Sequence, residues 1–295
     1  MSYLKCLSKI YENSKKIIFD KNSKFIIMSD VHRGDGNWAD SFAKNQNIYF
    51  AALEYYFNEG YSYIELGDGD ELWENRSLKD IVHEHSDAFW IMKKFYDNNR
   101  LHMLYGNHDL VKKSPQFVEK NLFEFFSQRY NKNFDLFKNI KIHEGLILEN
   151  KETNNEIFLI HGHQVDFLNN DIWLIARFLV RYFWRPLENF CFNDVTRTAK
   201  NYEKKKDMSK KLTDWVIKEN KALIAGHNHR PMFPEIGEPP YFNDGSCVHP
   251  RCITGIEISE ESICLIKWSL KSNKDRILII EREILAGPRK INDYF

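Results

Sequence analysis

The chain has 295 residues, of which 43% are hydrophobic and 28% are charged, and its 42 lysines and arginines balance 42 aspartates and glutamates. This composition is that of a globular protein, and it excludes a disordered chain, a collagen-like repeat and a small disulfide scaffold. Proteins that hold nucleic acid by bulk charge need a basic excess, so no nucleic-acid partner is expected.

Five short apolar segments each end in an aspartate, an asparagine or a histidine. Short apolar runs bounded by glycine and polar residues predict buried strands. These segments are residues 25–30, 63–68, 101–107, 157–161 and 222–227. Apolar residues at helical spacing lie between the early strands and predict helices over 42–57, 88–96 and 114–126. The chain therefore begins as alternating strands and helices.

The last quarter of the chain follows a different sequence pattern. It reads as short strands joined by polar turns, over residues 241–246, 253–258, 262–268 and 276–285. Residues 168–220 are instead almost wholly helical in pattern and form too long an interval for a simple crossover. We therefore expect a single domain over residues 1–295, with residues 168–220 as an inserted helical cap.

Polar side chains that suit divalent metals stand at the ends of the five predicted strands. Open α/β sheets place their ligands at the carboxyl ends of strands, and carboxylate, imidazole and amide groups are common metal ligands. Alone, each residue is compatible with chance or with a structural hydrogen bond; together they predict a centre for two metal ions. The residues are Asp30, His32, Asp68, Asn107, His161, His227 and His229.

These residues fall into motifs that resemble those of the calcineurin-like metallophosphoesterase superfamily. The motifs are Asp30-x-His32, Gly67-Asp68, Gly106-Asn107-His108-Asp109, His161 and Gly226-His227-x-His229. The resemblance implies an α/β fold, a four-layer α/β/β/α sandwich with an inserted helical cap. It also implies two ligand sets that share Asp68 as a bridge. One set is Asp30, His32, Asp68 and His229, and the other is Asp68, Asn107, His161 and His227.

Within the superfamily, the sequence resembles the UDP-2,3-diacylglucosamine diphosphatase group. The shared motifs include Gly67-Asp68-x-x-Glu71-x-Trp73 and His161-Gly-His163-Gln, and that group also carries a helical cap after the strand-end histidine. Two positions depart from the pattern of that group, which typically has arginine at the position of His108 and aspartate at the position of His163. A histidine suits a poorer leaving group that benefits from protonation.

The expected chemistry follows from two divalent ions about 3.5–4 Å apart, which clamp the attacking and leaving oxygens of an in-line phosphoryl displacement. The attacking group would be a hydroxide that bridges the two metals. We expect His108 to protonate the leaving oxygen. Asp109 either orients that imidazole or is a simple turn carboxylate. The ligand set suits manganese first, and also iron, zinc, cobalt or nickel.

Several further residues are candidates for contact with substrate. Asn107, Arg33 and Arg230 belong to or adjoin the metal motifs, and the two arginines are placed in sequence to touch phosphate oxygens. Arg177 and Arg181 recur at helical spacing and form a stripe. That stripe is either a solvated edge or a surface that contacts an anionic, partly apolar substrate or the membrane.

Three functions remain open from the sequence. The first is a dinuclear-metal hydrolase of phosphomonoesters or phosphodiesters, the second a pyrophosphatase acting on a nucleotide-lipid, and the third a non-catalytic metal-binding scaffold. The expected partner is a phosphorylated small molecule or a lipid-like substrate. Five scattered cysteines without a C-x-x-C pair and no apolar leader predict a cytoplasmic protein, with peripheral contact at the inner face of the membrane as an option.

Overall fold

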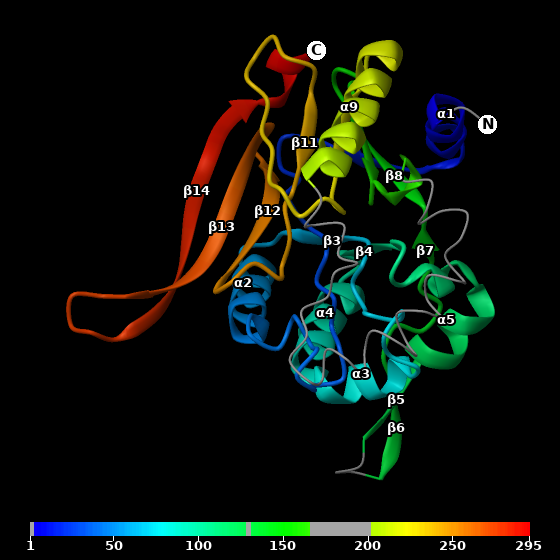
Figure 1. Cartoon of the computed structure of the whole chain (residues 1–295), viewed down its shortest axis with the longest axis vertical. Coiled ribbons are helices and arrows are strands. Elements are labelled where there is room, and N and C mark those ends of the chain that lie inside the picture. The colour runs from blue at the N-terminus through cyan, green and yellow to red at the C-terminus, as the bar shows by residue number, and fades with distance from the viewer. Residues whose placement is uncertain (1–2, 128–130, 166–201) are drawn as a thin grey trace.

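The computed structural model describes residues 3–127, 131–165 and 202–295. In this part of the chain, two large β-sheets pack face to face and helices cover their outer surfaces (Figure 1). A long hairpin extends away from the body of the sandwich at the left of the view, and a short one projects at the bottom (Figure 1).

The larger sheet has seven strands and supplies three of the predicted strand ends. Its order is β14 (Leu278–Lys290), β13 (Ser262–Ser272), β12 (Cys252–Ser259), β2 (Phe25–Met28), β3 (Ser62–Leu66), β4 (Leu101–Leu104) and β7 (Ile142–His143). Strands β2, β3, β4 and β7 are parallel, whereas β12 pairs with β2 in the antiparallel sense. The carboxyl ends of β2, β3 and β4 therefore meet at one edge.

The smaller sheet has five strands and supplies the other two strand ends. Its order is β1 (Lys15–Phe19), β8 (Gly145–Asn150), β9 (Glu156–Ile160), β10 (Ala222–Ala225) and β11 (Tyr241–Asn243). Strands β9, β10 and β11 are parallel, so β9 and β10 end on the same side. A separate hairpin joins β5 (Glu124–Ser127) to β6 (Lys132–Asp135).

Strand β2 shows why the central strands read as continuous apolar runs. All four of its residues are buried, but they alternate between two cores. Phe25 and Ile27 pack between the two sheets, whereas Ile26 and Met28 pack under the outer helices. A strand covered on both faces needs apolar residues at every position, which removes the period-two signal of a half-exposed strand.

Helices form the two outer layers. On the seven-stranded sheet lie α2 (Gln46–Asn58) and α4 (Ser86–Asp97), and on the five-stranded sheet lie α1 (Tyr3–Asn13) and α9 (Tyr202–Glu219). Two shorter helices, α3 (Leu78–Glu84) and α5 (Pro115–Leu122), flank this body. The predicted α/β/β/α sandwich is therefore confirmed.

Local sequence explains the helix ends that were predicted best. Helix α5 begins where expected, because the Ser114 hydroxyl accepts a hydrogen bond from the Phe117 N–H and Pro115 occupies the first turn. Helix α2 ends just before Gly60, which has a φ of +82°. The helix predicted over 114–126 is too long, because Phe125 and Phe126 belong to strand β5.

The predicted cap at residues 168–220 needs a correction at its second end. Helix α9 packs Leu212 and Trp215 against the five-stranded sheet, so it is a layer of the sandwich rather than part of a cap. Residues 168–201 lie outside the described residues. None of the described helices combines the length and the apolar character that crossing a membrane requires.

Candidate metal centre

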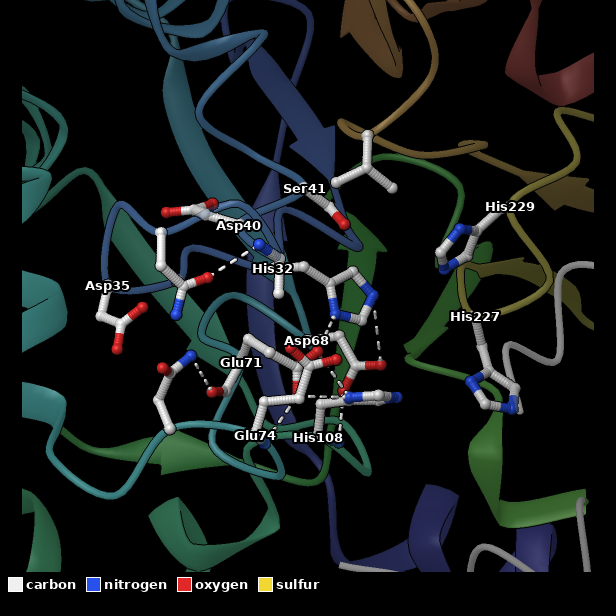
Figure 2. Close-up of a pocket in the computed structure, with 15 residues that line it drawn as sticks. His32, Asp35, Asp40, Ser41, Asp68, Glu71, Glu74, His108, His227 and His229 are labelled. Atoms are coloured by element: carbon white, nitrogen blue, oxygen red, sulfur yellow. Dashed lines mark hydrogen bonds and ion pairs between the residues drawn. The ribbon is translucent and has the colours of Figure 1, made fainter. Parts of the chain in front are cut away.

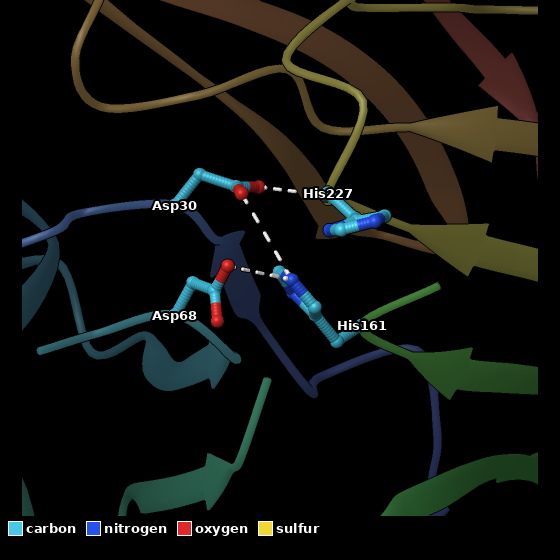
Figure 3. Close-up of side chains that lie close together, drawn as sticks. All are labelled: Asp30, Asp68, His161 and His227. Atoms are coloured by element: carbon cyan, nitrogen blue, oxygen red, sulfur yellow. Dashed lines mark hydrogen bonds and ion pairs between the residues drawn. The ribbon is translucent and has the colours of Figure 1, made fainter. Parts of the chain in front are cut away.

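Both sheets deliver side chains to one buried cluster at the edge where their parallel strands end. Asp30 and His32 follow β2, Asp68 follows β3 and Asn107 follows β4. From the other sheet, His161 follows β9, and His227 and His229 follow β10. Figure 3 shows Asp30 and Asp68 facing His161 and His227 across the gap between the sheets. The structure thus brings together six of the seven residues that the sequence suggested as ligands, and Asn107 lies in the chain between Gly106 and His108, which both approach Asp68.

The backbone at the cluster is bent in a way that side chains rarely tolerate. Five of the seven residues have a positive φ: Asp30 (51°), His32 (50°), Asp68 (51°), His227 (67°) and His229 (54°). The left-handed region costs a residue with a side chain about 1 kcal/mol or more, and such strain concentrates at functional sites. Gly106 allows a further close approach, because a Cβ there would lie 2.1 Å from the Asp68 Oδ1.

The side-chain atoms of the cluster form two overlapping groups. Asp30, Asp68, His161 and His227 make one group, and Asp30, His32 and His229 make the other. The Asp68 Oδ2 lies 3.1 Å from the His161 Nε2 and 3.9 Å from the His32 Nε2. The Asp30 Oδ1 lies 2.9 Å from the His229 Nε2 and 4.0 Å from the His161 Nε2. Both carboxylates are therefore positioned between the two groups.

Hydrogen bonds fix the outer atom of several ligands and leave the inner atom facing the cluster. The Asp30 Oδ2 accepts the His227 N–H at 2.7 Å, and the Asp68 Oδ1 accepts the His108 N–H at 2.8 Å. The His161 Nδ1 pairs with the Leu66 carbonyl at 2.9 Å. Partners of this kind orient metal ligands and set the tautomer of a ligating histidine.

The inner atoms, by contrast, are buried and make no well-directed hydrogen bond among the described residues, although the Asp30 Oδ1 and the His161 Nε2 lie within salt-bridge distance of other inner atoms. They are the Asp30 Oδ1, the His32 Nε2, the His161 Nε2 and both polar side-chain atoms of Asn107. Buried polar atoms nearly always make well-directed hydrogen bonds, so a group of convergent atoms without them needs an explanation. Carboxylate, imidazole and amide donors around one space fit a divalent cation.

The charges of the cluster are mutually dependent. Burial disfavours a charged carboxylate, but the neighbouring imidazoles hold the pKa values of Asp30 and Asp68 well below the usual range. In return, and against the effect of its own burial, these carboxylates raise the pKa of His161 to about 9. Burial dominates at His229 and lowers its pKa to about 4. A metal that binds here must displace the proton of His161.

His108 lies beside this cluster and is held by two residues that the sequence analysis left without a role. Its Nδ1 lies 2.8 and 2.7 Å from the two carboxylate oxygens of Glu71 (Figure 2). Its ring stacks on Trp73 with centroids 4.4 Å apart. The Glu71 Oε2 also lies 2.9 Å from the His32 Nδ1. Glu71 therefore joins a candidate ligand to the candidate acid. Both residues that contact His108 belong to the motif Gly67-Asp68-x-x-Glu71-x-Trp73, which was the indication available in the sequence.

Asp109 was predicted either to orient His108 or to serve as a turn carboxylate, and the structure gives it a supporting role. The Asp109 Oδ1 accepts the Gly106 N–H at 2.7 Å, and the Oδ2 accepts the Gly69 N–H at 3.2 Å. The Oδ2 also pairs with the Lys112 Nζ at 2.7 Å. Asp109 thus connects the loops that carry Asp68 and His108, while the carboxylate that contacts the imidazole is that of Glu71.

The predicted contact of Arg33 with phosphate is wrong. Its side chain is fully buried and pairs with Glu65 at 2.7 Å and with Asp70 at 2.7 Å. Lys112 lies 2.6 Å from the other oxygen of Asp70. Although burial opposes ionisation, these two cations lower the pKa of Asp70 to about 2. The arginine supports the floor of the site instead of reaching into it.

Replacing Lys112 with methionine is expected to destabilise the protein by about 3–5 kcal/mol, because Asp70 and Asp109 would lose a buried partner. Thermal unfolding followed by circular dichroism measures the loss. The matched control is Lys113→Met, one residue along the chain, where the side chain is exposed. Its free energy of unfolding is expected to change by no more than about 0.5 kcal/mol. Equal melting temperatures for the two variants would contradict the role of this network.

The other predicted contacts with substrate have different outcomes. Asn107 is buried directly after β4; its backbone carbonyl accepts the Trp73 Nε1–H at 2.5 Å, and neither polar atom of its carboxamide has a hydrogen-bond partner among the described residues. Arg230 is exposed, directly after His229, and its N–H donates to the Asn228 Oδ1 at 2.8 Å. Arg177 and Arg181 lie outside the described residues.

Comparisons with known proteins agree with the geometry. A family model described as calcineurin-like phosphoesterase matches residues 23–231. A search of curated proteins found no significant match. A predicted phosphoesterase structure from Streptococcus pneumoniae aligns with 15% identity over 89% of this chain and 97% of its own, with a TM-score of 0.37.

Two further solved structures align at similar levels. Vps29 from Chaetomium thermophilum has 11% identity over 89% of this chain and 95% of its own, with a TM-score of 0.37. A 5'-nucleotidase from Candida albicans has 10% identity over 92% of this chain and 52% of its own, with a TM-score of 0.32. The family model covers more than half of the sequence and contains all seven candidate ligands. The chain belongs to the calcineurin-like phosphoesterase family.

Proposed function

We propose that this protein is a phosphoesterase that uses two divalent metal ions, with manganese as the first candidate. The observation that carries the proposal is the convergence of buried carboxylate and imidazole atoms, all within 4.8 Å of one another in each ligand group of the described cluster. Family membership alone would not suffice, because a fold does not imply an activity.

The proposed roles of the ligands follow their positions. Asp30, His32 and His229 would hold one ion, and Asn107, His161 and His227 would hold the other, with Asp68 between them. Two bound ions would supply Lewis-acid stabilisation of phosphoryl oxygens and a nucleophilic water of lowered pKa. The protein's part is to hold the ions in a buried site, where outer hydrogen bonds orient Asp30, Asp68 and His161.

His108 is the proposed proton donor to the leaving oxygen. Its Nδ1 pairs with Glu71, which leaves the Nε2 for the pocket, and the side chain is 22% exposed. The Trp73 ring fixes the plane of the imidazole. A carboxylate–imidazole pair holds a histidine in one orientation, so this arrangement suits general acid catalysis.

The two alternatives from the sequence predict different substrates. A pyrophosphatase of the UDP-2,3-diacylglucosamine type would release a nucleoside monophosphate, which leaves without a proton and gives His108 little to do. A non-catalytic scaffold would need neither His108 nor Glu71. The intact pair between these two residues favours an ordinary phosphoester with a poor leaving group.

Hydrolysis of bis-p-nitrophenyl phosphate and p-nitrophenyl phosphate tests the proposal. The Mn-loaded protein should release p-nitrophenol from at least one of them, and removal of metal with EDTA should stop the reaction. Metal content is measured on the same sample. Absence of turnover with two metal ions bound would favour the scaffold, whereas turnover of a nucleotide-lipid pyrophosphate alone would favour the second alternative.

A further inference from the structure

Helix α9 places its first turns at the edge of the five-stranded sheet where the candidate ligands lie. Only residues 220–221 connect α9 to β10, so the helix runs back along the strand in the opposite direction. The N-terminal end of α9 therefore lies beside the carboxyl end of β10, from which His227 and His229 follow. A contact fixes this level of the helix, because the Asn228 Nδ2 donates to the Ser209 Oγ at 3.3 Å.

Lys205 lies one helical turn before Ser209, on the same face of α9. Residues four apart share a face of a helix, and helical side chains tilt toward the N-terminus. Lys205 therefore extends beyond the contact at Ser209, toward the loop that carries the two candidate histidine ligands. Its side chain is half-buried, and the charged groups that act on it are Arg230 and Asp30.

A second basic side chain approaches the same edge from the segment between β11 and β12. The Cys247 N–H donates to the Asp30 carbonyl at 3.2 Å, which attaches this segment to the loop of a candidate ligand. Val248 lines the pocket over the metal cluster together with His229. The Nε2 of the adjacent His249 is buried without a hydrogen-bond partner among the described residues.

Lys205, Arg230 and His249 form a basic rim whose charges repel one another. Burial and the charge of Arg230 lower the pKa of Lys205. Burial also lowers the pKa of His249, against the opposing charge of Asp30, and Lys205 lowers it further. Asp30 is the carboxylate that acts on both groups, but it is a candidate metal ligand, so bound cations would compete for its charge. An anion held at the basic rim would relieve this repulsion.

The basic rim lies on the side of the pocket away from the proposed acid. The ring of His32 contacts the rings of both His229 and His108, with centroids 5.3 and 4.6 Å apart. Figure 2 shows His227 and His229 on one side of this pocket and Asp35 on the other. A leaving group that takes a proton from His108 departs on the acidic side, so the organic part that stays on phosphorus can extend to the basic rim.

We propose that Lys205, together with Arg230 and His249, binds a second anionic group of the substrate, carried by the organic part that remains attached to phosphorus. The proposal rests on the proposed phosphoesterase function and names the substrate class of the same site. That class is phosphodiesters whose retained organic group carries a further phosphate or carboxylate. A hydrogen bond between charged groups changes affinity by about tenfold or somewhat more.

Two diesters that differ by a single phosphate test this contact. One is the p-nitrophenyl ester of thymidine 5'-monophosphate, and the other is the same ester with a phosphate on its 3'-oxygen. In the Mn-loaded wild-type protein, the 3'-phosphate should lower KM about tenfold. In Lys205→Gln this advantage should be lost, with little change in kcat or in KM for the diester without the 3'-phosphate. Lys205→Arg should retain most of the preference, and Lys206→Gln, at an exposed neighbouring position, should change neither substrate.

A binding measurement separates failure of this inference from failure of the phosphoesterase function. In isothermal titration calorimetry, the Mn-loaded wild-type protein should bind thymidine 3',5'-bisphosphate about tenfold more tightly than thymidine 5'-monophosphate, and Lys205→Gln should bind both equally. If neither diester is hydrolysed but this difference appears, the anion site stands and the catalytic proposal falls. If Lys205→Gln keeps the wild-type ratio of KM values or of affinities, the inference is overturned. An unchanged ratio together with weaker sedimentation with phosphatidylglycerol vesicles would overturn it as well and assign Lys205 to a lipid surface.

Discussion

Replacing Asp68 with asparagine is expected to remove at least one metal ion and to lower the rate of hydrolysis by more than about a thousandfold, because bound metals supply several kcal/mol of transition-state stabilisation. The Asp68 Oδ2 lies 3.1 Å from the His161 Nε2 and 3.9 Å from the His32 Nε2, so its charge serves both ligand groups. Asparagine keeps the shape of the side chain and can still accept the His108 N–H, which protects the fold.

The control for this substitution is Asp97→Asn on helix α4, where an exposed carboxylate pairs with Lys93 at 2.8 Å. Such surface pairs contribute little, so this variant should keep its metals and its activity. Metal content by mass spectrometry and initial rates with bis-p-nitrophenyl phosphate are measured on both variants. An Asp68→Asn protein with two metal ions and full activity would contradict the assignment of the site.

The sequence predicts that these side chains lie together because the chemistry of the candidate ligands and their positions in the chain indicate the same edge of the sheets. Each of the five strand ends combines an apolar run with a polar terminus, as in residues 25–30 and 157–161. Such a run must be buried on both faces, and the polar residue that follows it then falls at the edge of the sheet. Residue type and strand end together locate a ligand without knowledge of side-chain contacts.

The direction of a side chain cannot be predicted in the same way. Arg33 directly follows a candidate ligand, but its guanidinium is directed into the core, where Glu65 and Asp70 compensate its charge. Glu65 lies in the middle of an apolar strand, and only the fold reveals that it faces the arginine. Sequence adjacency to the motif therefore led to the wrong role for Arg33.

Roles that depend on contacts between distant segments were missed for a related reason. Glu71 reaches both His32 and His108, which are 39 and 37 residues away in the chain. Asp109, next to His108, has its carboxylate turned toward backbone N–H groups and Lys112 instead. The loop conformation after β4 decides between these two carboxylates, and no local pattern determines it.

His108→Ala is expected to lower kcat by about 10²–10⁴, the usual contribution of a positioned general acid, while metal content stays unchanged. The loss should be largest for alkyl phosphoesters, whose leaving oxygen needs a proton, and smaller for p-nitrophenyl esters. This dependence on the leaving group is expected because Glu71 and Trp73 hold the His108 ring outside the two ligand groups that contain Asp30. The matched control is His83→Ala, at an exposed position of helix α3.

Metal analysis of the same variant distinguishes two interpretations of His108. The ring nitrogens of His32 and His108 and the Glu71 carboxylate lie close enough together to form a ligand group of their own. If His108 belongs to such a group, His108→Ala loses a metal ion and all esters slow by the same factor. If it is the acid, both metal ions remain and the ratio of alkyl to aryl rates falls, because only the alkyl ester depends on the proton. The leaving-group dependence, more than the size of the loss, therefore decides the role of this histidine.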